Sequence, residues 1–185
     1  MSERFPLSDK LGYSPNQVDE FLMLAKQQYL NPGSKIVDVT LVRGQRFDLV
    51  KHGYKISSVD LAMEKLEDVF AQRELEGKYD QQGFAVFISE TNELVNMLSE
   101  RVSRARKKRF ARRRWPNRGY SKRQVDLLCS QVAKHLDGSQ LLTAQDLRLS
   151  VFKTKRGGYA EHQVDAFIDK VVELLQRQNI VGKTS

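Results

Sequence analysis

Apolar residues recur at helical spacing along most of this 185-residue chain. In the first such stretch Val18, Phe21, Leu22 and Ala25 fall on one side of a helix, and four later stretches repeat the same period. The expected helices cover residues 15–29, 58–76, 84–108, 122–135 and 161–178. The pattern therefore predicts a mainly α protein.

The segments between these helices carry weaker signals. Residues 35–42 are rich in β-branched side chains, so a short strand is possible there. Residues 142–148 occupy the matching place later in the chain and have the pattern of one capped helical turn, so we favour a helical turn in both places. The polar residues 77–83 are bounded by glycines and predict a turn, and residues from Val181 onward are expected to fray.

One short motif, Gly-Tyr followed after four residues by Val-Asp, occurs four times. Two apolar positions come soon after each copy. The first and third tyrosines lie 107 residues apart and the second and fourth 105, so the copies form a duplicated pair. The motif residues are Gly12, Tyr13, Val18, Asp19, Gly53, Tyr54, Val59, Asp60, Gly119, Tyr120, Val125, Asp126, Gly158, Tyr159, Val164 and Asp165.

Each copy is interpreted as the start of a helix. If Ser14 is the N-cap, Pro15 takes the first helical position and Gln17 completes a capping box. Tyr13 and Val18 then take the two positions of a hydrophobic staple. The glycine before each tyrosine is expected to supply a turn conformation that other residues resist. The motif residues are therefore assigned a structural role rather than contact with a ligand.

These observations predict four short turn-plus-helix repeats, arranged as a duplicated pair and joined by a helical, basic connector. The expected division is a first repeat pair over residues 1–77, the connector over 78–114 and a second repeat pair over 115–185.

The net charge of +8 is concentrated in one stretch. Residues 101–118 contain ten Lys or Arg and no acidic residue, so the remaining chain has a net charge of −2. Such a run predicts an anionic partner, either an anionic membrane surface or the phosphates of a nucleic acid. Phe110 and Trp115 could then stack on bases or lie at a lipid headgroup interface. A solvated helix end without a partner is the alternative.

The candidate contact residues fall into two groups. Those of the basic run are Arg106, Lys107, Lys108, Arg109, Arg112, Arg113, Arg114 and Arg118. Those of the loops just before the second and fourth motif copies are Lys51, His52, Lys155 and Arg156.

Nothing in the sequence predicts an enzyme. Cys129 occupies an apolar position of the motif and is expected in the core, and the three histidines lack the spacing of metal ligands. No glycine-rich phosphate loop follows a strand. We therefore expect no catalytic residue, metal or cofactor. With no apolar run of ~20 residues, no signal-peptide pattern and one cysteine, the expected location is the cytoplasm.

The motif, its spacing and its lead-in together resemble the DivIVA-type domain of bacterial cell-division and polarity scaffolds. The resemblance is strongest from Leu142 through Phe152 and Gly158-Tyr159 to Ile168, and the other three copies match at the same motif positions. The arrangement is similar to the tandem-repeat branch of that family. The resemblance implies a peripheral membrane scaffold that gathers protein partners, such as the division or cell-envelope machinery, on the inner face of the cytoplasmic membrane.

Three functions remain open on this basis. The first is a non-enzymatic scaffold or adaptor of DivIVA type. The family's loop before Gly-Tyr carries an exposed aromatic residue and a basic one, whereas this chain has Lys51-His52 and Arg156-Gly157, so we expect any membrane contact to be electrostatic. The second is a nucleic-acid-binding protein that uses residues 101–118, and the third is a plain protein-interaction adaptor. Self-association is also possible, although a tandem pair could satisfy the pairing of such domains within one chain.

Overall fold

The computed structural model describes residues 5–31, 33, 36–114, 116–148 and 150–184. The protein is mainly helical, with 64% of its described residues in helices and two small antiparallel sheets among them, which confirms the predicted fold class at that level. The chain divides into two compact units, Met1–Gly77 and Lys78–Ser185. Each unit is described by itself.

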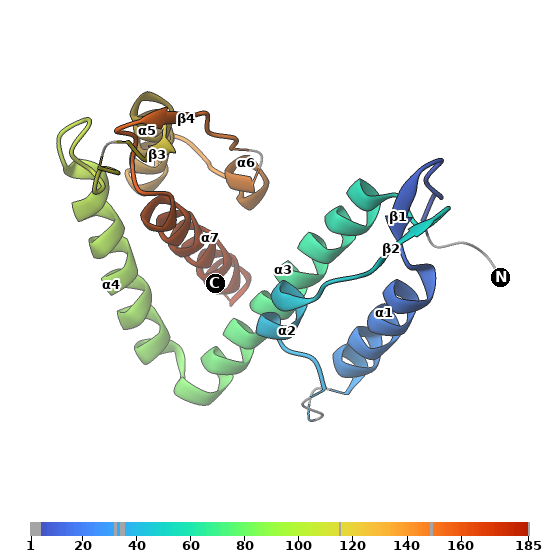
Figure 1. Ribbon diagram of the computed structural model, residues 1–185. Helices are drawn as coiled ribbons and strands as arrows, with labels where there is room; N and C mark the ends of the chain where they lie inside the picture. The colour runs from blue at the N-terminus through green and yellow to red at the C-terminus, as the bar shows by residue number, and fades with distance from the viewer. Residues whose placement is uncertain (1–4, 32, 34–35, 115, 149, 185) are drawn as a thin grey trace. The chain divides into compact units, whose positions relative to one another are not determined.

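The first unit begins with a strand and a helix, β1 (Leu11–Tyr13) and α1 (Pro15–Leu30). A helical turn, α2 (Val39–Gly44), leads to β2 (Leu49–Lys51) and then to the long helix α3 (Ile56–Gln82), whose last residues pass the unit boundary. β2 pairs antiparallel with β1 at the end of the unit where both helices begin (Figure 1). The core consists of two small clusters, one around Phe21 and Phe70 and one around Val18 and Tyr54.

The second unit repeats this order after an additional helix, α4 (Phe84–Ser103). β3 (Arg118–Tyr120) precedes α5 (Lys122–Leu136), and α6 (Ala144–Arg148) leads through β4 (Thr154–Arg156) to α7 (Glu161–Thr184). α4 packs against both α5 and α7 (Figure 1). A single large hydrophobic cluster forms the core of the unit; most of its residues come from these three helices, and Phe110, Leu142, Leu147 and Tyr159 complete it.

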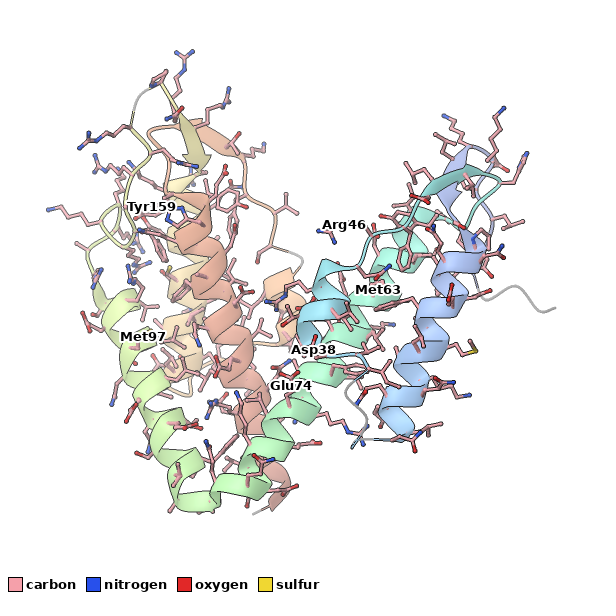
Figure 2. The ribbon with its side chains drawn as sticks, turned by 60° about the horizontal axis from the view of Figure 1, so that its bottom comes forward. Asp38, Arg46, Met63, Glu74, Met97 and Tyr159 are labelled. Carbon is pink, nitrogen blue, oxygen red and sulfur yellow. The ribbon has the colours of Figure 1, made fainter. Side chains whose placement is uncertain are left out.

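The helix starts agree closely with the sequence predictions. Ser14 and Ser121 are the N-caps of α1 and α5, with Pro15 at the first helical position of α1. The two expected helical turns are present as α2 and α6. Asp38 caps α2 by accepting a hydrogen bond from the Leu41 amide, beside Glu74 of α3 (Figure 2). Thr143 and Asp146 exchange hydrogen bonds at the start of α6. Lys35 lies outside the described residues.

Three predicted boundaries are wrong. α3 continues through residues 77–82, and only Gly83, with φ +80°, separates it from α4. α4 ends at Ser103 rather than Lys108, because the chain turns away there. α7 continues through Val181 to Thr184 because burial of Ile180 stabilises its last turns against fraying.

The predicted capping boxes of α1 and α5 are also absent. Neither Ser14 nor Ser121 makes a side-chain capping hydrogen bond. Gln17 instead crosses to the segment before β2, where its side-chain oxygen accepts from the Asp48 amide at 2.8 Å. Gln124 does the same in the second unit and accepts from the Lys153 amide at 2.9 Å. Gln17 and Gln124 thus each join the two halves of their unit.

The Gly-Tyr segments of each unit cross one another at very short backbone distance. In the first unit the amides of Tyr13 and Tyr54 each donate to the other's carbonyl, at 3.0 and 2.8 Å. In the second unit Tyr120 and Tyr159 repeat the exchange at 3.0 and 2.9 Å.

This crossing explains the four motif glycines. A Cβ atom on Gly119 would lie 2.1 Å from the Tyr159 oxygen, and a Cβ atom on Gly12 would lie 2.4 Å from the Tyr54 oxygen. Gly53 and Gly158 face the partner backbone in the same way. None of the four has a positive φ, so the predicted turn role is wrong. Glycine is required because the two crossing segments approach too closely for a side chain.

The tyrosine of each copy reaches the aspartate of the copy it crosses. Tyr54 donates its hydroxyl to Asp19 at 3.1 Å, and Tyr159 donates to Asp126 at 3.0 Å. The reciprocal pairs are Tyr13 with Asp60 and Tyr120 with Asp165. Burial and the neighbouring carboxylate raise the pKa of Tyr13 and of Tyr120. The Gly-Tyr and Val-Asp parts of the motif are therefore the two sides of one contact between copies.

Candidate functional site

The basic run of residues 101–118 begins on α4, and its described residues between α4 and β3 form irregular chain. Lys107 adopts φ +65°, and Lys108 closes a turn by donating its amide to the Ala105 carbonyl. This turn ends the helical path that the sequence predicted to continue to Lys108. It also directs Arg109 and Phe110 into the core, where both are buried.

Arg109 is therefore not a surface contact, contrary to the sequence prediction. Its Nη1 donates to the Asp126 carbonyl at 2.8 Å and lies 3.7 Å from the Asp126 carboxylate. Its Nε donates to the Arg104 carbonyl. A buried guanidinium needs such partners because an unpaired buried charge is very costly. The cation serves the structure of the loop.

Asp126 is the centre of a buried polar cluster that the sequence did not indicate. Its two carboxylate oxygens accept from the Tyr159 hydroxyl at 3.0 Å and from the Lys107 amide at 2.9 Å. The Tyr159 hydroxyl in turn accepts from the Arg109 amide. Desolvation is the main cause that raises the pKa of Tyr159 to about 12. Figure 2 shows Tyr159 beside the upper end of the second unit's helices. The cluster fixes the start of the basic run.

The remaining predicted cations of the run are exposed: Arg106, Lys107, Lys108, Arg112, Arg113, Arg114 and Arg118. Backbone hydrogen bonds place residues 111–113 against the fourth motif copy, because Arg113 donates its amide to Gly158 and Ala160 donates to Ala111. The Arg113 Cγ lies 3.1 Å from the position of a Cβ on Gly119. Arg112 and Arg113 are thus held beside β3, and Arg114 follows them directly in the chain.

The predicted loop residues Lys155 and Arg156 join this group through the sheet. Arg118 on β3 is the register partner of Arg156 on β4, and Gly119 is the partner of Lys155. Both loop residues are exposed. A residue that the sequence did not select, Lys122, also belongs here: its pKa is lowered first by burial and then by the nearby Arg112 and Lys107.

We call this surface the basic tip. Its members are Lys107, Arg112, Arg113, Arg114, Arg118, Lys122, Lys155 and Arg156. Like charges at this density repel one another and favour an anionic partner that would neutralise them.

The corresponding end of the first unit has a different character. The predicted contact residues Lys51 and His52 are exposed there, and His52 adopts φ +55° in the turn after β2. Leu11 on β1 is the register partner of Lys51, and Leu7 bridges to Tyr54 as Arg112 bridges to Tyr159. Leu7, Leu11 and Leu49 are all exposed. Apolar side chains are therefore exposed at this end, where the sequence had predicted only a basic contact.

The described residues contain no group of three or more His, Cys, Asp or Glu side chains that could hold a metal ion. No helix in the described part of the chain has both the length and the apolar character needed to cross a membrane.

Cys129 is fully buried, as predicted, and its burial raises the pKa of its thiol to about 11. The folded thiol is therefore unreactive at pH 8, since the thiolate is the nucleophile.

We expect modification of Cys129 by a disulfide reagent at pH 8 to follow unfolding. We also expect native stability to fall between about pH 9 and 11. Stability falls in this range because the unfolded thiol, with its pKa near 9.0, loses its proton at a lower pH than the folded thiol. The rate at which the reagent modifies Cys129, measured over a urea series, checks the first expectation. Rapid modification without urea would contradict it.

Comparison of the chain with models of protein families, with curated proteins and with solved structures gave no match.

Proposed function

We propose that this chain is a non-enzymatic scaffold or adaptor of DivIVA type, whose basic tip binds the anionic surface of a membrane. The convergence of the basic run with Lys122, Lys155 and Arg156 on one end of the second unit is the observation that carries the proposal. By its resemblance, its partners would be other proteins, such as the division or cell-envelope machinery. The four motif copies would be a duplicated pair.

Pairing of motif copies inside each unit supports the DivIVA-type assignment. The first copy crosses the second, and the third crosses the fourth, with the same reciprocal tyrosine–aspartate contacts in both units. The pairing that separate domains of this type achieve as dimers would thus be supplied within one chain. We accordingly propose that the protein is a monomer in solution.

Phe110, one of the two aromatic residues that flank the run, is buried against Tyr159 and Phe167, so its ring is available neither to a base nor to a headgroup interface. One observation favours lipid over nucleic acid as the anionic partner. The matching end of the first unit exposes Leu7, Leu11 and Leu49 next to Lys51. Leucines among lysines suit a headgroup interface better than a phosphate backbone.

The test replaces Arg112, Arg113 and Arg114 by glutamine and measures binding to anionic vesicles, neutral vesicles and duplex DNA over a salt series. Each basic residue near an anionic leaflet contributes about 1 kcal/mol, so the triple variant is expected to bind anionic vesicles about a hundredfold more weakly. The matched control replaces the exposed lysines Lys26, Lys78 and Lys134, which removes the same charge away from the basic tip. It is expected to change affinity less than about threefold.

Tighter binding to DNA than to anionic vesicles would assign the basic tip to nucleic acid. Equal losses in the two triple variants would show that net charge alone matters and would remove the basic tip from the proposal. Binding to neither surface would leave an adaptor whose basic tip has another partner. A dimer mass from light scattering would contradict the proposed internal pairing.

A further inference from the structure

Three cations of the basic tip, Lys107, Arg112 and Lys122, come together at the start of α5. Asp126 lies one turn after Lys122 on the same face of the helix, and its carboxylate accepts the Lys107 amide at 2.9 Å. The Arg112 Nη2 in turn lies 3.5 Å from the Lys107 carbonyl oxygen. Tyr159 forms one backbone bridge with Arg112 and another with the last residue of β3, two positions before Lys122. Segments that are distant in the sequence therefore bring the three side chains to one small region.

The three positive charges act on one another. Burial lowers the pKa of Lys122 first, and the charges of Arg112 and Lys107 lower it further. Asp126 acts in the opposite direction, but its carboxylate is already shared between the Lys107 amide and the buried Arg109 guanidinium. In the described part of the chain, no acidic side chain forms an ion pair with any of the three cations. The region is therefore short of negative charge.

Backbone donors add to the cations at this end of α5. Lys122 is the first residue of the helix, and among the described residues neither its amide nor the Arg123 amide has an acceptor. Ser121, the N-cap, makes no side-chain capping hydrogen bond. The first amides of a helix carry a partial positive charge and can donate to an anion. Both the side chains and the backbone thus favour an anionic group here.

The first unit shows that the fold does not need these charges. Leu7 takes the place of Arg112 in the bridge to the crossing tyrosine, and Pro15 starts α1 as Lys122 starts α5. The crossing of the motif copies nevertheless has the same backbone hydrogen bonds in both units. Cations that repel one another destabilise the folded chain unless an anion neutralises them. Binding of an anion therefore explains the three cations better than a structural role does.

We propose that Lys107, Arg112 and Lys122 form a site for one phosphate group that carries two negative charges, as in a phosphomonoester. Such a group has three terminal oxygens and a charge of about −1.5 to −2 at pH 7. An arginine can bind two of these oxygens as a fork, and a lysine binds as a point charge. A phosphodiester has one negative charge and would leave more of the repulsion in place. The site would give the proposed membrane function, on which this inference rests, a preferred headgroup.

The test compares binding of the full-length chain to vesicles that contain phosphatidate, a phosphomonoester lipid, and to vesicles that contain phosphatidylserine, matched in surface potential. The wild-type chain is expected to bind the phosphatidate vesicles about tenfold more tightly, because charge-assisted hydrogen bonds add to the general attraction. Lys122→Gln and Arg112→Gln are each expected to reduce this ratio to about twofold or less, because each removes one of the groups that hold the phosphate.

Lys155→Gln is the matched control. Lys155 is another exposed cation of the basic tip, but it lies on β4, outside the group of three. Its loss removes the same charge, so binding to both kinds of vesicle should weaken by the same factor and the ratio should stay at about tenfold. Circular dichroism of the three variants checks that they are folded.

Glycerol phosphate, a soluble phosphomonoester, distinguishes the two sources of the group. Its binding is followed by NMR of the Lys122 side chain, whose pKa should rise when the anion is bound. Displacement of the chain from phosphatidate vesicles by glycerol phosphate would assign the site to a soluble ligand, and binding without displacement would assign it to the headgroup. Binding of glycerol phosphate by a chain that binds no vesicle would support the site and contradict the proposed membrane function.

Three results would overturn the site. Equal binding of the wild-type chain to the two anionic vesicles would do so and leave the proposed membrane function intact. An equal loss of the ratio in Lys122→Gln and Lys155→Gln would show that the whole basic tip, and not three side chains, sets the preference. Binding neither to anionic vesicles nor to glycerol phosphate would overturn both the site and the proposed function.

Discussion

Replacing Gly119 by alanine is expected to destabilise the second unit by about 3–5 kcal/mol, among the larger effects of single substitutions. The new methyl group would lie 2.1 Å from the Tyr159 carbonyl oxygen and 2.9 Å from its carbonyl carbon. Backbone atoms cannot rotate away as a side chain can. The crossing must therefore open, which breaks the reciprocal hydrogen bonds between Tyr120 and Tyr159.

Urea unfolding followed by circular dichroism, with Cys129 modification as the reporter of the second unit, measures this effect. Gly182→Ala is the matched control, because no atom outside its own helix lies within 4 Å of a Cβ there. It is expected to change stability in the opposite direction, by up to about 1 kcal/mol, since alanine favours a helix over glycine. Equal midpoints for Gly119→Ala and the wild-type chain would show that the crossing tolerates a side chain.

The sequence predicted the parts of this fold that depend on local physics. The helix starts at Pro15 and Lys122 lie where the motif predicts them, although the preceding serines make no side-chain cap, and the cap at Thr143 marks the second of the two helical turns. These signals act over a few residues, so they can be read along the chain. The helical spacing of the apolar residues predicted the helices themselves for the same reason.

The strands and the crossing could not be predicted in this way. Each strand has three residues, and its partner lies far away in the chain. The spacing of the motif was visible, but its tyrosine and aspartate were assigned to one helix start because they are close in sequence. The structure shows that each tyrosine reaches the aspartate of the other copy. Arg109 was wrongly predicted to be a surface contact for a similar reason, because only the fold brings Asp126 close to it.

Replacing Asp126 by alanine is expected to cost about 3–5 kcal/mol, because it leaves the buried Arg109 cation without its carboxylate. The Tyr159 hydroxyl and the Lys107 amide lose their acceptor in the same change. Asp169→Ala, at an exposed position of α7, is the control and should lie within about 0.5 kcal/mol of the wild-type chain. The measurement is again urea unfolding, with trypsin cleavage within residues 104–114 as a local readout.

The double variant Asp126→Leu/Arg109→Met separates the penalty of an unpaired charge from the value of the ion pair. Apolar replacement of both partners removes the buried charge altogether, so the double variant should be more stable than Asp126→Ala and cleave more slowly. An Asp126→Ala chain as stable as Asp169→Ala would show that Arg109 finds another partner or leaves the core. In that case the buried cluster would not hold the basic run in place, and the geometry of the basic tip would have to come from the β3–β4 pairing alone.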